Sequence, residues 1–106
     1  MKPALFSIIY GPSVREHILS VDKAEHSFIR DMIEHQLARE PHVESRNRKP
    51  LKQPVEDGAD WELRFGDQNR YRVFYRCDLL RREVRVLALG IKDRNRLLIG
   101  GKEVKL

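Results

Sequence analysis

The stretch WELRFGDQNRYRVFYRC, residues 61–77, decides the expected fold because it contains two runs of alternating side chains. In the first run, Trp61, Leu63 and Phe65 alternate with Glu62 and Arg64. Alternation with a period of two is typical of a strand that has one buried face. The four residues between the runs, GDQN, form a short polar connection. Two strands joined by so short a loop predict an antiparallel hairpin.

The second run, RYRVFYRC at residues 70–77, carries an unusual number of arginines on one side. The apolar side has Tyr71, Val73, Tyr75 and Cys77, and the opposite side has Arg70, Arg72, Phe74 and Arg76. A strand face that meets only water usually mixes charges of both signs. The arginines therefore have two interpretations: a soluble face, or a face that meets an anionic partner.

The distribution of charge along the chain favours the second interpretation. Residues 1–60 contain nine Lys and Arg against ten Asp and Glu, a net charge of −1, whereas residues 61–106 contain twelve against six, a net charge of +6. Basic charge concentrated in one region is typical of a surface that binds nucleic acid or an acidic protein. We expect the binding surface in the C-terminal half.

Length and composition exclude several other classes of protein. With 106 residues, the chain is expected to form a single domain, 1–106, with a shallow site. The lone Cys77 reads as a buried apolar residue of a cytoplasmic protein. The histidines lack the spacing of metal ligands, so neither a metal nor another cofactor is expected. The early run ALFSIIY is too short for a membrane span and lacks a signal-peptide cleavage site.

The remaining segments predict an α+β fold. Residues 4–10 read as a strand that ends at Gly11-Pro12, and Ser13 is placed to cap a short helix over 14–19. A second helix begins near Asp22, ends before Pro41 and carries an apolar stripe of Phe28, Ile29, Met32, Ile33 and Leu37. Residues 41–60 read as a long connection, and 84–89 as the last of three meander strands. We expect the helical hairpin on one face of the sheet, with Arg64 and Arg72 exposed on the other.

The segments WELRFGDQNRYRVFYRCD and LALGIKDRNR resemble the sheet of the RelE/ParE superfamily, the toxins of bacterial type II toxin-antitoxin systems. The resemblance covers nearly the whole chain, including the helical hairpin and EPHVESRNRKPLK. It implies a cytoplasmic bacterial protein with a RelE-like fold, that is, an N-terminal strand, a helical hairpin and a three-stranded antiparallel meander. It also implies an acidic cognate antitoxin as partner.

The ribonuclease branch of that family, the mRNA interferases, cleaves messenger RNA in the ribosomal A site. By resemblance, the catalytic candidates are Glu62, Arg64, Arg72, Lys92 and Arg94. The two strand arginines suit a phosphate clamp, because a guanidinium binds two phosphate oxygens at once. Glu62 is a candidate base for the ribose 2′-hydroxyl, or simply a partner for Arg64. Further RNA-binding candidates are Arg46, Arg48, Lys49, Lys52 and Arg96.

The chain departs from the ribonucleases of this family after its basic cluster. Those proteins have a tyrosine or histidine there for base stacking or proton transfer, whereas here the sequence reads RLLIGG at 96–101. The departure keeps two alternatives open. One is a non-catalytic binding toxin, as in the ParE branch that blocks DNA gyrase, and the other is a degenerate toxin that only binds its antitoxin.

Overall fold

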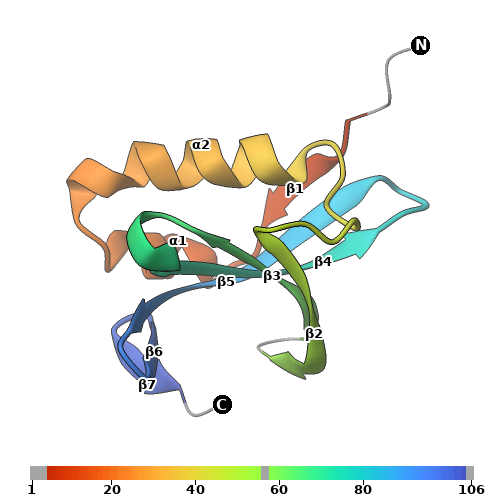
Figure 1. The fold of residues 1–106 in the computed structure, drawn as a ribbon. Coiled ribbons are helices and arrows are strands. Elements are labelled where there is room, and N and C mark those ends of the chain that lie inside the picture. The colour runs from red at the N-terminus through yellow and green to blue at the C-terminus, as the bar shows by residue number, and fades with distance from the viewer. Residues whose placement is uncertain (1–4, 56–57, 105–106) are drawn as a thin grey trace.

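The fold is a curled sheet with a helical layer on one face (Figure 1). The computed structural model describes residues 5–55 and 58–104. The helical elements are α1 (Val14–Leu19), the 3₁₀ turn η1 (Lys23–Glu25), α2 (His26–Leu37) and the 3₁₀ turn η2 (Asp67–Asn69). The strands are β1 (Ser7–Tyr10), β2 (Arg48–Val55), β3 (Ala59–Phe65), β4 (Tyr71–Asp78), β5 (Glu83–Asp93), β6 (Arg96–Ile99) and β7 (Lys102–Val104).

The expected meander forms the centre of the sheet. The strand order in the described part of the chain is β2-β3-β4-β5-β6-β7, with antiparallel neighbours, and β1 pairs in parallel with the first half of β5. In Figure 1, β2 and the β6–β7 pair curve away from the side on which α2 lies. The sheet is therefore concave on the face opposite the helices.

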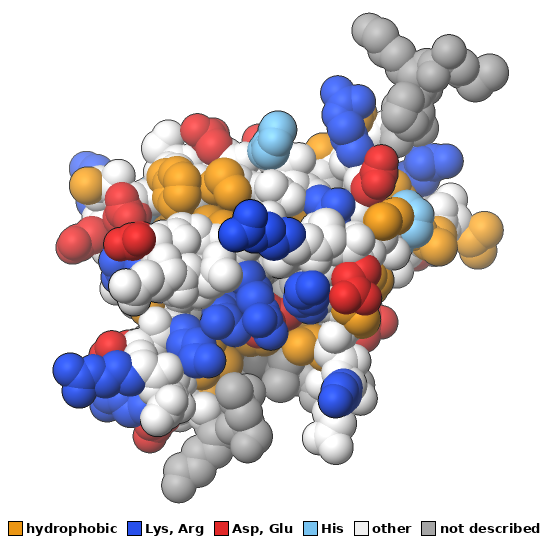
Figure 2. Space-filling view, in the orientation of Figure 1, with side chains coloured by type: hydrophobic (Ala, Val, Ile, Leu, Met, Phe, Trp, Pro, Cys, Tyr) orange, Lys and Arg blue, Asp and Glu red, His pale blue; other side chains and the backbone are white. Residues whose placement is uncertain are grey.

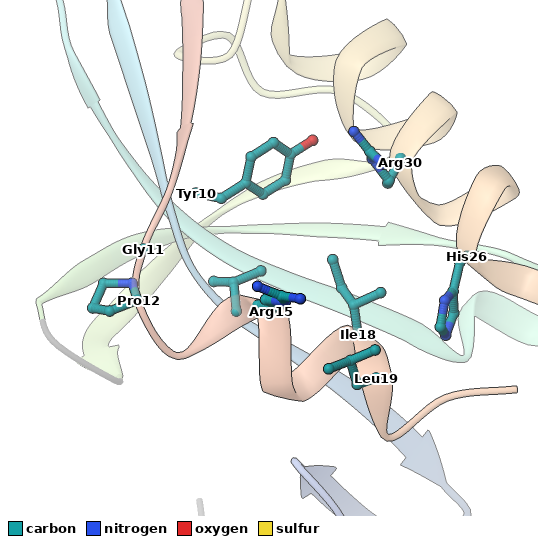
Figure 3. Close-up of a pocket in the computed structure, with 9 residues that line it drawn as sticks. Tyr10, Gly11, Pro12, Arg15, Ile18, Leu19, His26 and Arg30 are labelled. Atoms are coloured by element: carbon teal, nitrogen blue, oxygen red, sulfur yellow. The ribbon is translucent and has the colours of Figure 1, made fainter. Parts of the chain in front are cut away.

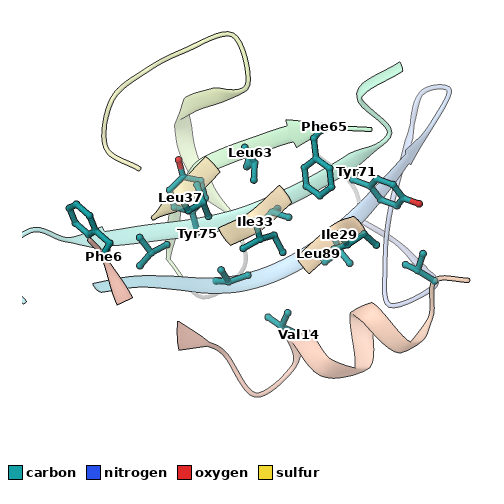
Figure 4. Packing of buried hydrophobic residues seen from close by; sticks show 14 residues of the cluster. Phe6, Val14, Ile29, Ile33, Leu37, Leu63, Phe65, Tyr71, Tyr75 and Leu89 are labelled. Atoms are coloured by element: carbon teal, nitrogen blue, oxygen red, sulfur yellow. The ribbon is translucent and has the colours of Figure 1, made fainter. Parts of the chain in front are cut away.

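The helix-facing core confirms the alternation predicted from the sequence. Leu63, Phe65, Tyr71, Val73 and Tyr75 are at most 1% exposed. They pack against apolar residues of both helices (Figure 4), which are Val14, Ile29, Ile33 and Leu37. In the predicted stripe of α2, Phe28 lies at the margin and remains 40% exposed, although its ring contacts Phe65 edge-on. The apolar side of the β3–β4 pair therefore packs against the helices, and the arginines lie on the opposite side.

The opposite face is not bare, contrary to our expectation. A second cluster of buried residues lies there, made by Ala59, Phe74, Ala88, Leu97 and Ile99. Its existence depends on β6, which brings Leu97 and Ile99 over Gly90 so closely that a Cβ at Gly90 would lie 2.8 Å from Leu97 Cδ1. The arginines of β4 therefore border a small apolar layer instead of standing alone in water.

The expected long connection at 41–60 is also wrong in part, because β2 occupies 48–55. Prolines at 50 and 54 suggested a loop, since proline cannot donate a hydrogen bond to a sheet ladder. β2 is an edge strand, where that donor is dispensable, and Pro50 pairs with Trp61. The basic cluster of this segment thus becomes part of the sheet.

The turn from β3 to β4 holds three unusual backbone positions. Gly66 has φ +84° and ψ −179°, a region that essentially only glycine adopts, and Gln68 and Asn69 have φ of +55° and +53°. The turn places the carbonyl oxygen of Asn69 2.9 Å from Arg72 Nε, and that of Arg70 2.7 Å from the backbone nitrogen of Lys92. The strained turn therefore positions two of the predicted site residues.

We expect Gly66→Ala to be strongly destabilising. A Cβ at this position would lie 2.6 Å from Cδ2 of Tyr71, whose buried ring cannot move aside. Together with the backbone strain, the free energy of unfolding should fall by about 2–4 kcal/mol, measured by urea denaturation. The control is Gly101→Ala, where φ is +82° but nothing lies within 4 Å, and the loss should be about 1 kcal/mol. Equal losses would show that Tyr71 does not oppose the substitution.

Candidate nucleic-acid interface

The register of the sheet brings charged residues from four strands onto the concave face. Lys49 of β2 lies opposite Glu62 of β3, and Arg64 lies directly opposite Arg72 of β4. Directly opposed residues have Cβ atoms about 4.5–5.5 Å apart. Lys92 of β5 follows two residues after Gly90, the partner of Arg72, and so lies on the same face. We call Lys49, Glu62, Arg64, Arg72 and Lys92 the cationic face.

Glu62 is the centre of this arrangement. Its residue exposure is 6%, and among the described residues it alone is both charged and buried. Its Oε1 accepts a hydrogen bond from Arg64 Nε at 2.6 Å and lies 3.5 Å from Arg72 Nη1. One carboxylate oxygen therefore contacts both arginines. The interpretation of Glu62 as a partner of Arg64 is confirmed, but the pair is not exposed at its carboxylate end.

Arg72 is less accessible than we expected. Its side chain is 12% exposed, compared with 39% for Arg64, so the prediction of two exposed arginines is wrong for Arg72. The second cluster lies beside Arg72, because its partner in β5 is Gly90, over which β6 brings Leu97 and Ile99. Burial lowers the pKa of the Arg72 guanidinium, an effect that Glu62 opposes and Arg64 reinforces. Arg72 still remains charged near neutral pH, because an arginine side chain loses its proton only in strongly alkaline solution.

The hairpin between β5 and β6 carries the remaining catalytic candidates. Lys92 and Arg94 are both exposed, and Arg94 adopts a left-handed backbone with φ +58° in the two-residue loop that joins Asp93 to Arg96. A non-glycine residue in this region is uncommon and strained. Arg96 donates to Asp93 at 3.3 Å with both side chains more than half exposed. The loop thus projects cations beyond one end of the cationic face.

The four basic residues predicted at 46–52 do not act together. Arg48 is turned toward the helical side, where its guanidinium donates to the carbonyl oxygens of Val43 and Gln36 and to the Gln36 side chain. It therefore serves to attach β2 to α2. Lys49 lies on the cationic face and forms an ion pair with Glu44 at 3.5 Å. Arg46 and Lys52 are exposed.

Figure 2 shows where the basic side chains gather on the surface. Lys and Arg side chains form a patch across the middle of the view, between α2 above and the outer strands β2, β6 and β7 below. Acidic side chains lie mostly around its margin. This is the arrangement expected of a surface that attracts a polyanion.

The two tyrosines of β4 lie on the opposite side of the sheet from the cationic face. Tyr71 and Tyr75 face the helices, where Tyr71 donates to Glu25 and Tyr75 to the carbonyl oxygen of Pro41. Burial raises the pKa of both hydroxyls. The absence of a tyrosine or histidine after the basic cluster is therefore not compensated by these two tyrosines. What the cationic face offers is charge stabilisation and orientation.

A separate groove of about 560 Å³ lies on the helical side of the sheet. Figure 3 shows Tyr10 of β1, Ile18 and Leu19 of α1, and Arg30 of α2 around it. The Tyr10 hydroxyl is enclosed, and burial together with nearby Glu34 raises its pKa. Sequence reasoning missed this groove, because it considered only the apolar stripe of the second helix, whereas β1 and α1 provide most of the lining.

Two further observations concern only the residues that the structure describes. No helix within 5–55 and 58–104 combines the length and apolar character needed to cross a bilayer. The same ranges contain no group of His, Cys, Asp and Glu arranged to hold a metal ion.

Comparison with solved structures shows a similarity of fold. The chain is similar to a chain of the toxin-antitoxin complex RelBE2 from Mycobacterium tuberculosis, with a TM-score of 0.69 and 22% sequence identity over 86% of this chain and 95% of that one. No protein-family model and no curated protein sequence matches the chain. The expected RelE-like α+β fold is thereby confirmed, while the roles of individual residues stay predictions.

Cys77 is expected to be unreactive, as predicted for a cysteine on the apolar face. Burial, assisted by Asp60, raises the pKa of its thiol to about 12. Because the thiolate is the nucleophile, alkylation by iodoacetamide at pH 8.5 should be slower in the folded protein by on the order of 10³ than in urea. Mass spectrometry of timed samples measures the two rates. Comparable rates in both states would contradict the burial of this thiol.

Proposed function

We propose that the chain is the toxin of a type II toxin-antitoxin system and that it cleaves messenger RNA in the ribosomal A site. The observation that carries the proposal is the pair of guanidiniums, Arg64 and Arg72, directly opposed on a concave basic face. Two convergent guanidiniums suit a phosphate, since each can donate two hydrogen bonds to it. The RelE-like fold and the RelBE2 similarity support the toxin role.

The proposed reaction is transesterification at one phosphodiester. The ribose 2′-oxygen attacks phosphorus and loses its proton, the bond from phosphorus to the 5′-oxygen breaks, and that oxygen gains a proton. The products are a 2′,3′-cyclic phosphate and a 5′-hydroxyl. Arg64 and Arg72 stabilise the charge that accumulates on the phosphorane oxygens. Lys92 and Arg94 hold the neighbouring phosphates of the chain.

Proton transfer in this proposal relies on the ribosome and on water. Lysine and arginine side chains normally have pKa values far above neutral pH, so they stabilise charge better than they donate protons. The ribosome supplies a bound and distorted substrate, which by itself lowers the barrier through orientation. Cleavage of free RNA should accordingly be slow.

A second candidate is a toxin that binds without cleaving. The observation that favours it is the position of Tyr71 and Tyr75 on the helical side, which keeps both hydroxyls of β4 away from the cationic face. Mapping of RNA 5′ ends after induction separates the two candidates. Cuts in phase with codons support the nuclease, whereas DNA damage with intact messages supports a gyrase-directed binder.

We expect Arg72→Lys to abolish growth arrest while leaving the fold intact. Lysine keeps the positive charge but loses the planar fork, and loss of a clamp on a phosphoryl transition state costs on the order of 10² to 10³ in rate. Arg72→Ala should do the same, with an additional loss of about 1–3 kcal/mol in unfolding free energy because a contact of buried Glu62 disappears. Growth after induction and thermal melting are the measurements.

The control for this experiment is Arg76→Ala. Arg76 lies on the same strand and is exposed, so its removal should change stability by no more than about 0.5 kcal/mol and leave toxicity unchanged. If Arg72→Lys and Arg76→Ala are both as toxic as the parent, the phosphate clamp is refuted.

We also propose that an acidic antitoxin segment covers the cationic face. Complementary charge accelerates association and shields the site from RNA. The groove beside Tyr10 gives the same partner an apolar contact, with Arg15 and Arg30 at its rim for acidic side chains. Disordered segments that fold on binding can span two such distant surfaces.

Reversing both charges in Arg72→Glu/Arg94→Glu should weaken antitoxin binding by at least tenfold and flatten its salt dependence, measured by calorimetry at two ionic strengths. Arg76→Glu/Arg81→Glu, at the other end of β4, is the control with equal charge change and should bind nearly as the parent. Leu19→Glu tests the groove, since it places a carboxylate on an apolar wall. Salt-insensitive binding unaffected by the first variant would overturn the charge-based contact.

A further inference from the structure

Glu62 lies at the centre of the cationic face, but its carboxylate is less accessible than a general base should be. Its side chain is 8% exposed, and its Oε1 is in contact with Arg64 Nε at 2.6 Å and Arg72 Nη1 at 3.5 Å. A general base must come within hydrogen-bond reach of the proton that it removes. The oxygen of Glu62 that the arginines engage is not free to meet a ribose hydroxyl.

The opposed arginines need a counter-charge in order to stay together. Arg64 and Arg72 are direct partners in the β3–β4 register, and like charges placed directly opposite each other destabilise a sheet. A buried carboxylate in turn is tolerated only when it is paired. Glu62 and the two arginines therefore stabilise each other as one unit.

The contacts of this unit determine which donors remain for a ligand. Arg64 uses Nε for Glu62, and Arg72 uses Nε for the carbonyl oxygen of Asn69 and Nη1 for Glu62. Among the contacts of the described residues, both terminal nitrogens of Arg64 and Nη2 of Arg72 are left for an anion. Because Nε of each arginine is held, the orientation of each guanidinium, and so of its remaining donors, is restricted.

We propose that Glu62 is a positioning residue that fixes Arg64 and Arg72 as a preassembled pair for one phosphate group, and that it is not the base. The inference deepens the proposed function and rests on it for the identity of the phosphate. It assigns the central carboxylate a role in anion binding despite its negative charge.

The two roles make opposite predictions for the binding of inorganic phosphate. If Glu62 only removes a proton, Glu62→Ala deletes a repelling charge and phosphate binds as well or better. If Glu62 positions the arginines, Glu62→Ala releases Arg64 and leaves Arg72 held only by the Asn69 carbonyl oxygen, and phosphate affinity should fall about fivefold to tenfold despite the added positive charge. Glu62→Gln retains an oxygen acceptor for Arg64 Nε and should bind phosphate at least as tightly as the parent.

Arginine Nε–H signals in nitrogen-15 NMR spectra provide the measurement, with assignments from Arg64→Lys and Arg72→Lys. In the parent and in Glu62→Gln, both signals should move together at one phosphate concentration. In Glu62→Ala the movement should require more phosphate. Should Glu62→Ala be too unstable for titration, the rate of RNA cleavage by Glu62→Gln decides, because the amide keeps an acceptor for Arg64 Nε but cannot act as a base.

Three outcomes would overturn the inference: tighter phosphate binding by Glu62→Ala, separate titration of the two arginine signals, or no response of the parent to phosphate. RNA cleavage on ribosomes adds a readout specific to the base role. The cleavage rate of Glu62→Gln should be within about tenfold of the parent rate, with the same pH profile. Loss of a general base would instead lower the rate by about 10² to 10⁴. A parent that never cleaves RNA refutes the proposed function, but the phosphate titration still decides the role of Glu62.

Discussion

The pairing of β3 with β4 is the constraint on which the rest of the structure depends. The same register that puts Leu63 beside Val73 under the helices puts Arg64 beside Arg72 on the concave face. Because side chains alternate strictly along a strand, neither pairing can exist without the other. Burial of the hydrophobic core therefore stabilises a register in which Arg64 and Arg72 are cross-strand neighbours, and the negative charge of Glu62 reduces the repulsion between them.

The curl of the sheet places this pair of arginines in a partly apolar environment. The outer strands bring apolar side chains such as Leu97 and Leu51 toward the centre of the concave face, where they pack with Phe74. Arg72 consequently lies beside a low-dielectric layer, in which charge–charge attraction is stronger than in bulk water. A basic face of this kind binds anions through a few oriented donors, in addition to the diffuse attraction of the surrounding lysines and arginines.

The sequence was most informative where alternation was unbroken. The runs at 61–65 and 71–77 predicted the central strands and the face of each residue, and the apolar stripe at 28–37 predicted α2. β2 was missed because proline at an edge strand looks the same in sequence as proline in a loop. The low exposure of Arg72 depends on strands distant in sequence, so no local pattern indicates it. The hydrogen bond from Arg72 to the Asn69 carbonyl oxygen was equally unpredictable, because every residue has a backbone carbonyl and the residue type does not show which one accepts.

One irregularity in β5 affects how this chain is compared with others. Phe74 pairs with Ala88 and Tyr75 with Val86, so Leu87 is an extra residue in the strand. Leu87 and Ala88 consequently both contact the second cluster, although they are consecutive. The two halves of β5 therefore follow alternations that differ in phase by one residue. An alignment that assumes one uninterrupted strand would assign Lys92 to the core and Ile91 to the binding face, and would compare the wrong positions across relatives.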